Sequence, residues 1–205
     1  MLYTYHQVSL SDASAGTAAA FTEWVGGTAR PAADEAGGEL IGVFLPQLGF
    51  QAHERLLLLR WRDAAGDALI GCPYVDAVTT DRLRATVRPA DSDQLKLGGI
   101  VVHRWFTIDP RDEEAFVALS KDAWLGFESE FAGSPFGLFT AEPKAEEGAS
   151  MRMLLITRYG SHADWEASRR PSPEVAGLFA RRRELTRATG ACSTITATLP
   201  FFAPS

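Results

Sequence analysis

The chain has 205 residues, of which 46% are apolar and 22% are charged, and its formal net charge is -6. This composition is typical of a globular protein that can bury a core without disulfides or structural metals. The net negative charge and the interrupted basic runs give no strongly basic face, so no nucleic-acid partner is expected. No apolar run is long enough to span a bilayer, so no membrane partner is expected either.

The first half of the chain predicts several strands and one clear helix. Residues 2–10 alternate apolar and polar side chains, as a half-buried strand does. Next come a helix over 17–25, which Arg30-Pro31 ends or kinks, and strands over 39–48, 54–62 and 82–88. The segment 63–80 is rich in Gly and Pro and is expected to hold at most a short helix.

The second half repeats the scheme more clearly after a linker predicted over residues 91–97. A strand over 99–108 leads into a helix that Asp109 caps and Pro110 begins, because Pro fits a first turn whose N–H has no partner. The remaining predicted elements are strands over 136–141 and 151–159, a helix capped by Ser161, its restart from Pro173 to Leu185 with Gly190 as the stop, and a closing strand over 192–199.

Short segments occur twice in the same order, which is typical of a duplicated structural unit. The matched pairs are Ile41-Gly42-Val43-Phe44-Leu45 with Phe136-Gly137-Leu138-Phe139-Thr140, Leu57-Leu58-Leu59-Arg60-Trp61 with Leu155-Ile156-Thr157-Arg158-Tyr159, Tyr5-His6 with Val102-His103, Trp24 with Trp124, and Ala85-Thr86 with Ala197-Thr198. We therefore predict two βαββαβ units, over 1–90 with a shortened second helix and over 98–205. Two crossover helices per unit cover one face of a four-stranded sheet, and the bare faces of two such sheets can bury each other.

This element order resembles the ferredoxin-like fold, and the tandem copy resembles the dimeric α/β barrel superfamily; within it, the chain is similar to the NIPSNAP family. The resemblance rests on Leu40-Ile41-Gly42-Val43-Phe44 with Gly49, on Leu57-Leu58-Leu59-Arg60-Trp61, and on the echoes Gly137-Leu138-Phe139 and Arg158-Tyr159 with Ser161, Trp165 and Arg169. It implies an α+β fold of two ferredoxin-like units packed sheet to sheet in one chain. It also implies small-molecule handling, and the second half is expected to keep the more complete pocket.

His103 is the candidate catalytic residue, and His6 is predicted to occupy the same place in the first half. An imidazole there could act as a base or a ligand anchor near neutral pH. The favoured alternative is a structural histidine that is hydrogen-bonded in the interior, because no nucleophile or carboxylate is tied to either residue by local spacing.

Aromatic and basic residues form a second candidate group for ligand binding. His103 and Trp105 share a face of one predicted strand, whereas Arg158 and Tyr159 point to opposite faces of a neighbouring strand. Trp124 lies beside the apolar stripe of the following helix. Such a wall could bind a flat, partly anionic molecule by stacking and a charge-assisted hydrogen bond. The alternative is that these rings fill the core.

Two functions stay open from the sequence. Similarity to barrels that include cofactor-independent monooxygenases acting on aromatic substrates implies an enzyme, with His103 moving a proton and Arg158 holding an oxyanion. The alternative is a non-enzymatic protein that binds a ligand or a protein partner and has a packed barrel.

The spacing of the four histidines and two cysteines matches no zinc pattern, so no metal is expected. No cofactor is expected either: haem bound through His103 is considered and set aside because no local signature supports it. The first residues carry no basic region followed by an apolar stretch, and Cys72 and Cys192 are most simply two free thiols, so a cytoplasmic location is expected. A monomer and a homodimer both fit.

Overall fold

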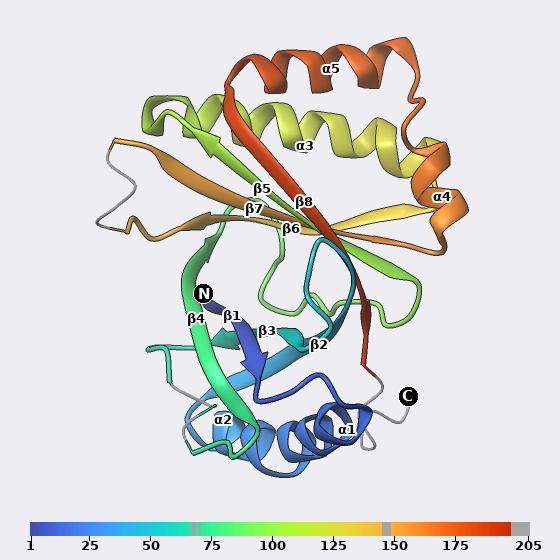
Figure 1. Cartoon of the computed structure of the whole chain (residues 1–205). Helices are drawn as coiled ribbons and strands as arrows, with labels where there is room; N and C mark the ends of the chain where they lie inside the picture. Colours follow the sequence, from blue (N-terminus) through green and yellow to red (C-terminus); the bar gives the residue numbers. More distant parts are fainter. Residues whose placement is uncertain (67–68, 70, 145–148, 198–205) are drawn as a thin grey trace. The chain divides into compact units, whose positions relative to one another are not determined.

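The computed structural model describes residues 1–66, 69, 71–144 and 149–197, and its class is α+β (Figure 1). Contacts divide the chain into two compact units: unit 1 is Met1–Leu83 with the chain from Thr194 onward, and unit 2 is Arg84–Ser193. The predicted match at Thr198 and the predicted strand end at Leu199 lie outside the described residues. None of the helices described is long and apolar enough to cross a membrane.

Unit 1 combines antiparallel strands with one long, interrupted helix, and its strand order is β4-β1-β3-β2. Its elements are β1 (Leu2–Leu10), α1 (Ala15–Trp24), the π-helical turn η1 (Val25–Ala29), α2 (Arg30–Glu35), β2 (Gly38–Leu48), β3 (Glu54–Trp61) and β4 (Val75–Ala85). The end of β8 joins this unit, where the Ala197 N–H donates to the Val43 carbonyl over 2.8 Å.

The first helix runs further than the sequence predicts. Ser14 caps α1 by accepting a hydrogen bond from the Thr17 N–H over 3.1 Å. Of the two outcomes predicted at Arg30-Pro31, an end or a kink, the end is wrong, because the helix continues to Glu35. The π-helical turn η1 carries the chain past Gly26-Gly27, and Pro31 then falls in the first turn of α2, where its missing N–H costs no hydrogen bond.

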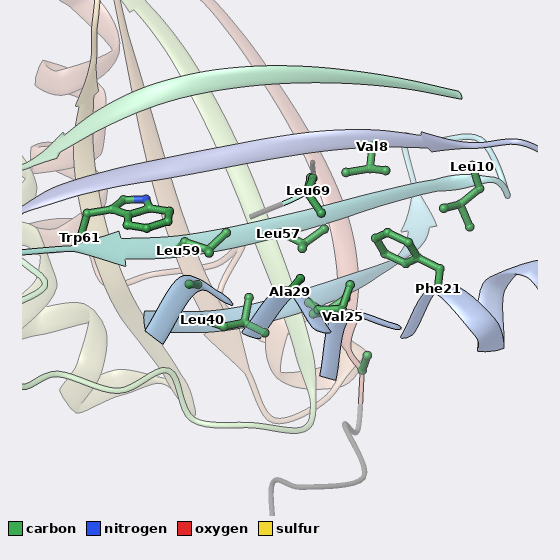
Figure 2. Packing of buried hydrophobic residues seen from close by; sticks show 13 residues of the cluster. Val8, Leu10, Phe21, Val25, Ala29, Leu40, Leu57, Leu59, Trp61 and Leu69 are labelled. Atoms are coloured by element: carbon green, nitrogen blue, oxygen red, sulfur yellow. The ribbon is translucent and has the colours of Figure 1, made fainter. Parts of the chain in front are cut away.

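A hydrophobic core fills the space between the helices and strands of unit 1. Phe21 and Val25 lie opposite Leu57 and Leu59 of β3, and each is at most 1% exposed (Figure 2). Trp61, also 1% exposed, closes one end of this core, and its indole N–H donates to the Thr4 hydroxyl over 2.9 Å.

Glycines make room for the ring of Trp61. A Cβ at Gly38 would lie 2.6 Å from the ring, and one at Gly66 would lie 2.9 Å from it. The large side chain therefore fits because its neighbours have none.

Unit 2 carries two long helices over its strands, whose order is β8-β5-β7-β6. Helices α3 and α5 lie side by side across one face of these strands (Figure 1). Its elements are β5 (Ile100–Ile108), the 3₁₀ turn η2 (Pro110–Asp112), α3 (Glu113–Glu130), β6 (Gly133–Ala141), β7 (Met151–Tyr159), α4 (His162–Ala167), α5 (Pro173–Glu184) and β8 (Thr186–Thr196).

The two units pair their central strands in the same register. Leu2 pairs with Trp61 in unit 1, and Ile100 pairs with Tyr159 in unit 2. Each unit also has a bulge just before a glycine, at Gly42 in β2 and at Gly137 in β6. The shared pairing matches the repeat that the sequence predicts, while a duplication as its origin stays a prediction, as do the ranges 1–90 and 98–205.

The register corrects one predicted equivalence. His6 pairs with Leu57, four residues before Trp61, whereas the residue that pairs with Leu155, four before Tyr159, is Arg104. His103 lies one residue away and therefore points to the other face of its strand.

The last strand also begins earlier than predicted. Helix α5 ends at Glu184, one residue before the predicted Leu185, but the prediction that Gly190 is its stop is wrong, because Gly190 lies inside β8. Residues 187–191 are all exposed and include no large apolar side chain, so they lack the half-buried pattern by which a strand is recognised.

Candidate ligand-binding cavity

A cavity of about 630 Å³ lies within unit 2, between α5 and the strand face that the helices cover. Strand alternation builds its floor, because every second residue of β5 and β7 points to the same face. The strand residues that line it are Val102, Arg104 and Phe106 of β5 and Leu155, Thr157 and Tyr159 of β7. Aromatic rings from the helices complete the wall, namely Trp124 and Phe127 of α3 and Phe179 of α5.

Close packing between α3 and α5 holds the helical side of the cavity. A Cβ at Gly126 would lie only 2.5 Å from Val175 Cγ2, so the two helices approach as they do because this position has no side chain. Ser172 caps α5, and its own N–H donates to the Glu130 carboxylate of α3 over 2.9 Å. The start of α5 is thereby tied to the end of α3.

Arg182 is a buried cation in the wall of the cavity. The residue is 7% exposed, and its guanidinium carbon lies 5.1 Å from the ring centres of Phe106 and Phe179 and 5.6 Å from that of Phe116. It donates to the Ser120 hydroxyl over 3.3 Å. Burial lowers the pKa of Arg182 to about 10, so the side chain stays charged at neutral pH.

Tyr159 places the titratable phenol of β7 in the same cavity. The residue is 6% exposed, and its ring meets that of Phe127 edge to face at 6.1 Å. Burial raises the pKa of the phenol. A hydrogen bond with Ser168 and the charges of Arg104, Arg169 and Arg182 act in the opposite direction but do not offset it. The phenol is therefore neutral at physiological pH and can donate a hydrogen bond.

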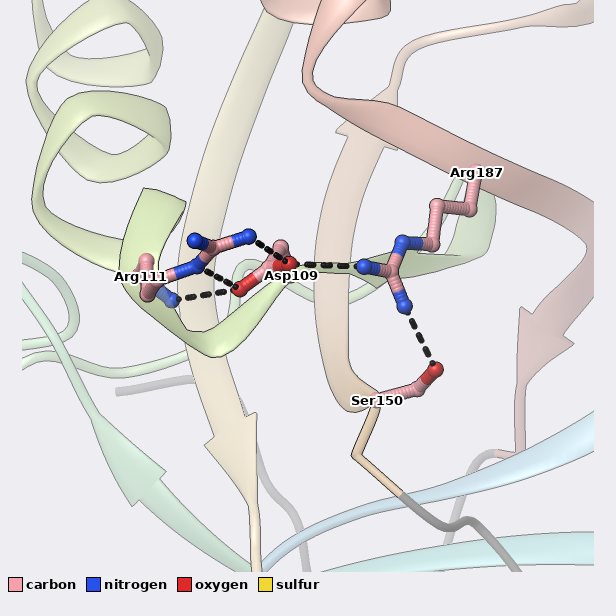
Figure 3. Close-up of polar contacts among 4 residues, drawn as sticks. All are labelled: Asp109, Arg111, Ser150 and Arg187. Carbon is pink, nitrogen blue, oxygen red and sulfur yellow. Dashed lines mark hydrogen bonds and ion pairs between the residues drawn. The ribbon is translucent and has the colours of Figure 1, made fainter.

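A polar network fixes the strand that borders the cavity mouth. Asp109 accepts hydrogen bonds from Arg111 and, over 2.6 Å, from Arg187 of β8, which also donates to Ser150 (Figure 3). Hydrogen bonds from Arg111 hold the pKa of Asp109 well below its usual range, so the carboxylate is charged at neutral pH. Since Thr186 and Thr189 line the cavity, this network positions part of its wall.

The structure brings together only two of the predicted site residues. Trp124 and Tyr159 both line the cavity. His103 and Trp105 point to the opposite face of β5, by the alternation that places Arg104 in the cavity. Arg158 likewise lies on the other face of β7, where its Nε donates to the Gly98 carbonyl over 3.0 Å.

The surroundings of His103 disfavour the proposed base. The residue is 0% exposed, and burial alone lowers its pKa from 6.5 to about 3. An imidazole with that pKa accepts a proton only weakly at neutral pH. The neighbouring Trp105 is half-buried under the guanidinium of Arg152, which lies 4.6 Å from the ring centre.

His6 lies in unit 1, within a hydrogen-bonded chain of side chains. Its Nε2 is 2.9 Å from the Thr4 hydroxyl, and its Nδ1 is 2.9 Å from the Thr80 hydroxyl. Thr4 in turn accepts from the indole N–H of Trp61. This arrangement suits the structural role that the sequence analysis weighed for His6.

Arginines are the cavity residues that the sequence analysis missed. Arg104 stands between Val102 and Phe106 on an otherwise apolar strand face, and Arg182 continues the helical stripe of Val175 and Phe179. The sequence does hold a signal for them: each arginine occupies a position where the periodicity predicts an apolar side chain. Arg169 stood within the family resemblance without a role.

Comparison with known proteins bears on the fold. No family model matches the chain, and no curated protein does. Similar solved structures include an anthrone oxidase-like protein, with 12% identity, a TM-score of 0.61, and coverage of 96% of this chain and 91% of that one. A ferredoxin fold protein related to antibiotic biosynthesis monooxygenases, from Listeria monocytogenes, has 11% identity, a TM-score of 0.52 and coverage of 97% and 95%.

One further comparison corrects the expectation that the protein has no cofactor. A mutant chlorite dismutase from Candidatus Nitrospira defluvii has 10% identity, a TM-score of 0.57 and coverage of 97% and 92%. Chlorite dismutases are haem-associated, so proteins of similar structure include a haem-associated one. The expectation is therefore wrong in excluding haem on the ground of a missing sequence signature.

The cavity itself fits an axially ligated haem poorly. Its described lining residues include no His, Cys or Met, and burial keeps Tyr159 as a neutral phenol. We therefore derive no step through haem. The structural likeness shows that the chain has the α+β fold of dimeric α/β barrel proteins.

Proposed function

We propose that unit 2 binds a small, largely aromatic or hydrophobic molecule in its cavity. The observation that carries this proposal is a space of about 630 Å³ bordered by the rings of Phe106, Trp124, Phe127, Tyr159 and Phe179. Cavities of about 300–1,000 Å³ with apolar walls and a few polar groups are typical of small-molecule sites. Stacking and apolar burial would supply the affinity, and the polar groups the orientation.

Filling the cavity tests the proposal. The probe is N-phenyl-1-naphthylamine, an uncharged aromatic fluorophore that brightens in apolar surroundings. Ala176 lines the cavity, so Ala176→Trp should abolish its binding. Ala118 is exposed on α3 outside the cavity, so Ala118→Trp is the matched control and should bind the probe as the wild type does. Equal binding by both variants, or no binding by the wild type, would contradict the proposal.

An oxygenase-like reaction without a cofactor is the second candidate, and the descriptions of the fold neighbours favour it. Anthrone is the natural probe: with O₂, its CH₂ group becomes a carbonyl and the second oxygen atom leaves as water. Tyr159, rather than His103, is the titratable group within reach of a substrate in the cavity. As a neutral phenol it would donate a hydrogen bond to the developing enolate oxygen.

Oxygen uptake with anthrone separates the enzyme from a binding protein. An enzyme should form anthraquinone above the buffer rate, and Tyr159→Phe should slow this without weakening anthrone binding. Uptake at the buffer rate would leave the non-enzymatic function. Membership of the NIPSNAP family, a cytoplasmic location and the choice between monomer and homodimer stay predictions.

A further inference from the structure

Positive charge in the cavity of unit 2 has no negative counterpart. Four arginines line the cavity, Arg104, Arg169, Arg182 and Arg183, whereas its described lining residues include no Asp or Glu. Arg182 is almost fully buried and Arg104 is half-buried, while Arg169 and Arg183 are exposed at the mouth. The cavity is thus cationic from its mouth to its wall.

These charges act on one another within a small space. Burial lowers the pKa of Arg104 and the charge of Arg169 lowers it further, whereas the Tyr159 hydroxyl acts in the opposite direction. The charges of Arg104 and Arg183 likewise lower the pKa of Arg182. Among the described residues, no carboxylate forms an ion pair with Arg104, Arg169 or Arg182.

Burying a guanidinium is unfavourable unless an anion or hydrogen-bond acceptors compensate it. Three aromatic rings and the Ser120 hydroxyl compensate part of the cost of burying Arg182. The Arg104 guanidinium lacks such compensation, because it makes no hydrogen bond to another described residue. Packing alone therefore does not explain why this strand face carries an arginine.

We propose that the cavity of unit 2 selects organic anions, with the acidic group of the ligand bound by Arg104 and Arg182 and guided in by Arg169. This inference rests on the proposed function, since it assigns a charge to the ligand of the same cavity. The ligand class is an aromatic or hydrophobic frame that carries one acidic group. Guanidinium groups bind carboxylate, sulfonate or phosphate oxygens through charge-assisted, often bidentate hydrogen bonds. The aromatic wall would take the frame, and the neutral phenol of Tyr159 can donate a further hydrogen bond.

A matched pair of probes isolates the charge. 8-Anilinonaphthalene-1-sulfonate and N-phenyl-1-naphthylamine share one aromatic frame and differ in the sulfonate. Titration of the full chain, followed by fluorescence, should give one site for each probe. The sulfonate should bind at least about tenfold more tightly, as one charge-assisted hydrogen bond would give.

Arginine variants assign the effect to residues. Arg104→Gln and Arg169→Gln should each weaken sulfonate binding, by about tenfold for Arg104→Gln, and should weaken binding of the uncharged probe clearly less, so that the preference for the sulfonate falls. Arg181→Gln is the matched control, because Arg181 is exposed on α5 and does not line the cavity. It should bind both probes as the wild type does. Arg169 is exposed, so its variant keeps the test valid if a change at Arg104 prevents folding.

The outcomes distinguish this inference from the function on which it rests. Preference for the sulfonate that falls in both cavity variants supports anion selection. Equal affinity for the two probes, unchanged in the variants, overturns anion selection and leaves the proposed function standing. Failure of both probes to bind the wild type overturns both.

Discussion

Units 1 and 2 pair their strands alike but use the space beneath their helices differently. In unit 1 that space is a core, closed by the buried indole of Trp61. At the same register position unit 2 has Tyr159, and at the position of His6 it has Arg104; both line a cavity. The comparison teaches that one strand arrangement can serve as a packed support or as a binding site, depending on a few side chains of one sheet face.

Truncating Trp61 is expected to have the largest effect on stability and tests whether unit 1 is more tightly packed than unit 2. Trp61→Ala removes a fully buried ring and its hydrogen bond to Thr4, so the free energy of unfolding should fall by about 3–5 kcal/mol. The matched change Tyr159→Ala should cost clearly less, because that ring already borders a cavity. Urea denaturation of both variants measures the difference. Equal losses would mean that unit 2 is packed as tightly as unit 1.

The sequence predicts the strands of the two units better than it predicts the candidate site in unit 2. The Gly-x-Phe segments at Gly42 and Gly137 and the apolar runs that end at Trp61 and Tyr159 carry the signal of a strand, and all four segments lie in strands as predicted. Strand ends without alternation, such as Gly190 in β8, carry no such signal.

The candidate site was predicted less well for a physical reason. A shift of one residue along a strand exchanges its faces, and aligning His103 with His6 made that shift. Trp124 and Tyr159 were assigned to the binding wall and do line the cavity, while Arg104 and Arg182 were missed. Both arginines occupy positions where the periodicity predicts apolar residues. The cavity that they face forms only when the helices pack on the strands, so the sequence alone does not show it.

A side chain at Gly126 should disturb the helical wall of the cavity. Gly126→Ala brings a methyl group into contact with Val175, and overpacking of this kind costs about 1–3 kcal/mol. We expect a lower midpoint in thermal unfolding and weaker binding of the uncharged probe, because α5 must move away from α3. Gly177→Ala, at an α5 position with open space around the added Cβ, is the control and should keep both properties.

Acid should destabilise the protein through His103. Its pKa is about 3 in the folded state and 6.5 as a free side chain, so below about pH 6.5 the unfolded chain takes up a proton that the folded chain does not. The resulting stability is present above this pH and is lost as the pH falls toward about 3. Between pH 7 and pH 5 the loss from this residue is about 2 kcal/mol.

His103→Gln provides the comparison for this effect. The variant should lose about 2 kcal/mol less than the wild type over the same pH interval, measured by urea denaturation at each pH. Identical pH profiles would show that His103 is not buried in its neutral form.

The smallest effect is expected at the network that borders the cavity. Asp109→Asn removes the negative charge that pairs with two exposed arginines, Arg111 and Arg187, so stability should fall slightly at low salt and hardly at all at high salt. Thermal unfolding at the two ionic strengths measures this. A loss that persists at high salt, or exceeds that of Gly126→Ala, would mean that the network supports more than the mouth of the cavity.

A crystal structure with bound 8-anilinonaphthalene-1-sulfonate tests the central claim most directly, because it locates the ligand. The account predicts a single probe molecule in the cavity of unit 2, with its rings against the aromatic wall and its sulfonate at Arg104 and Arg182. A probe bound in unit 1, or a cavity in unit 2 closed by its own side chains, would contradict the account.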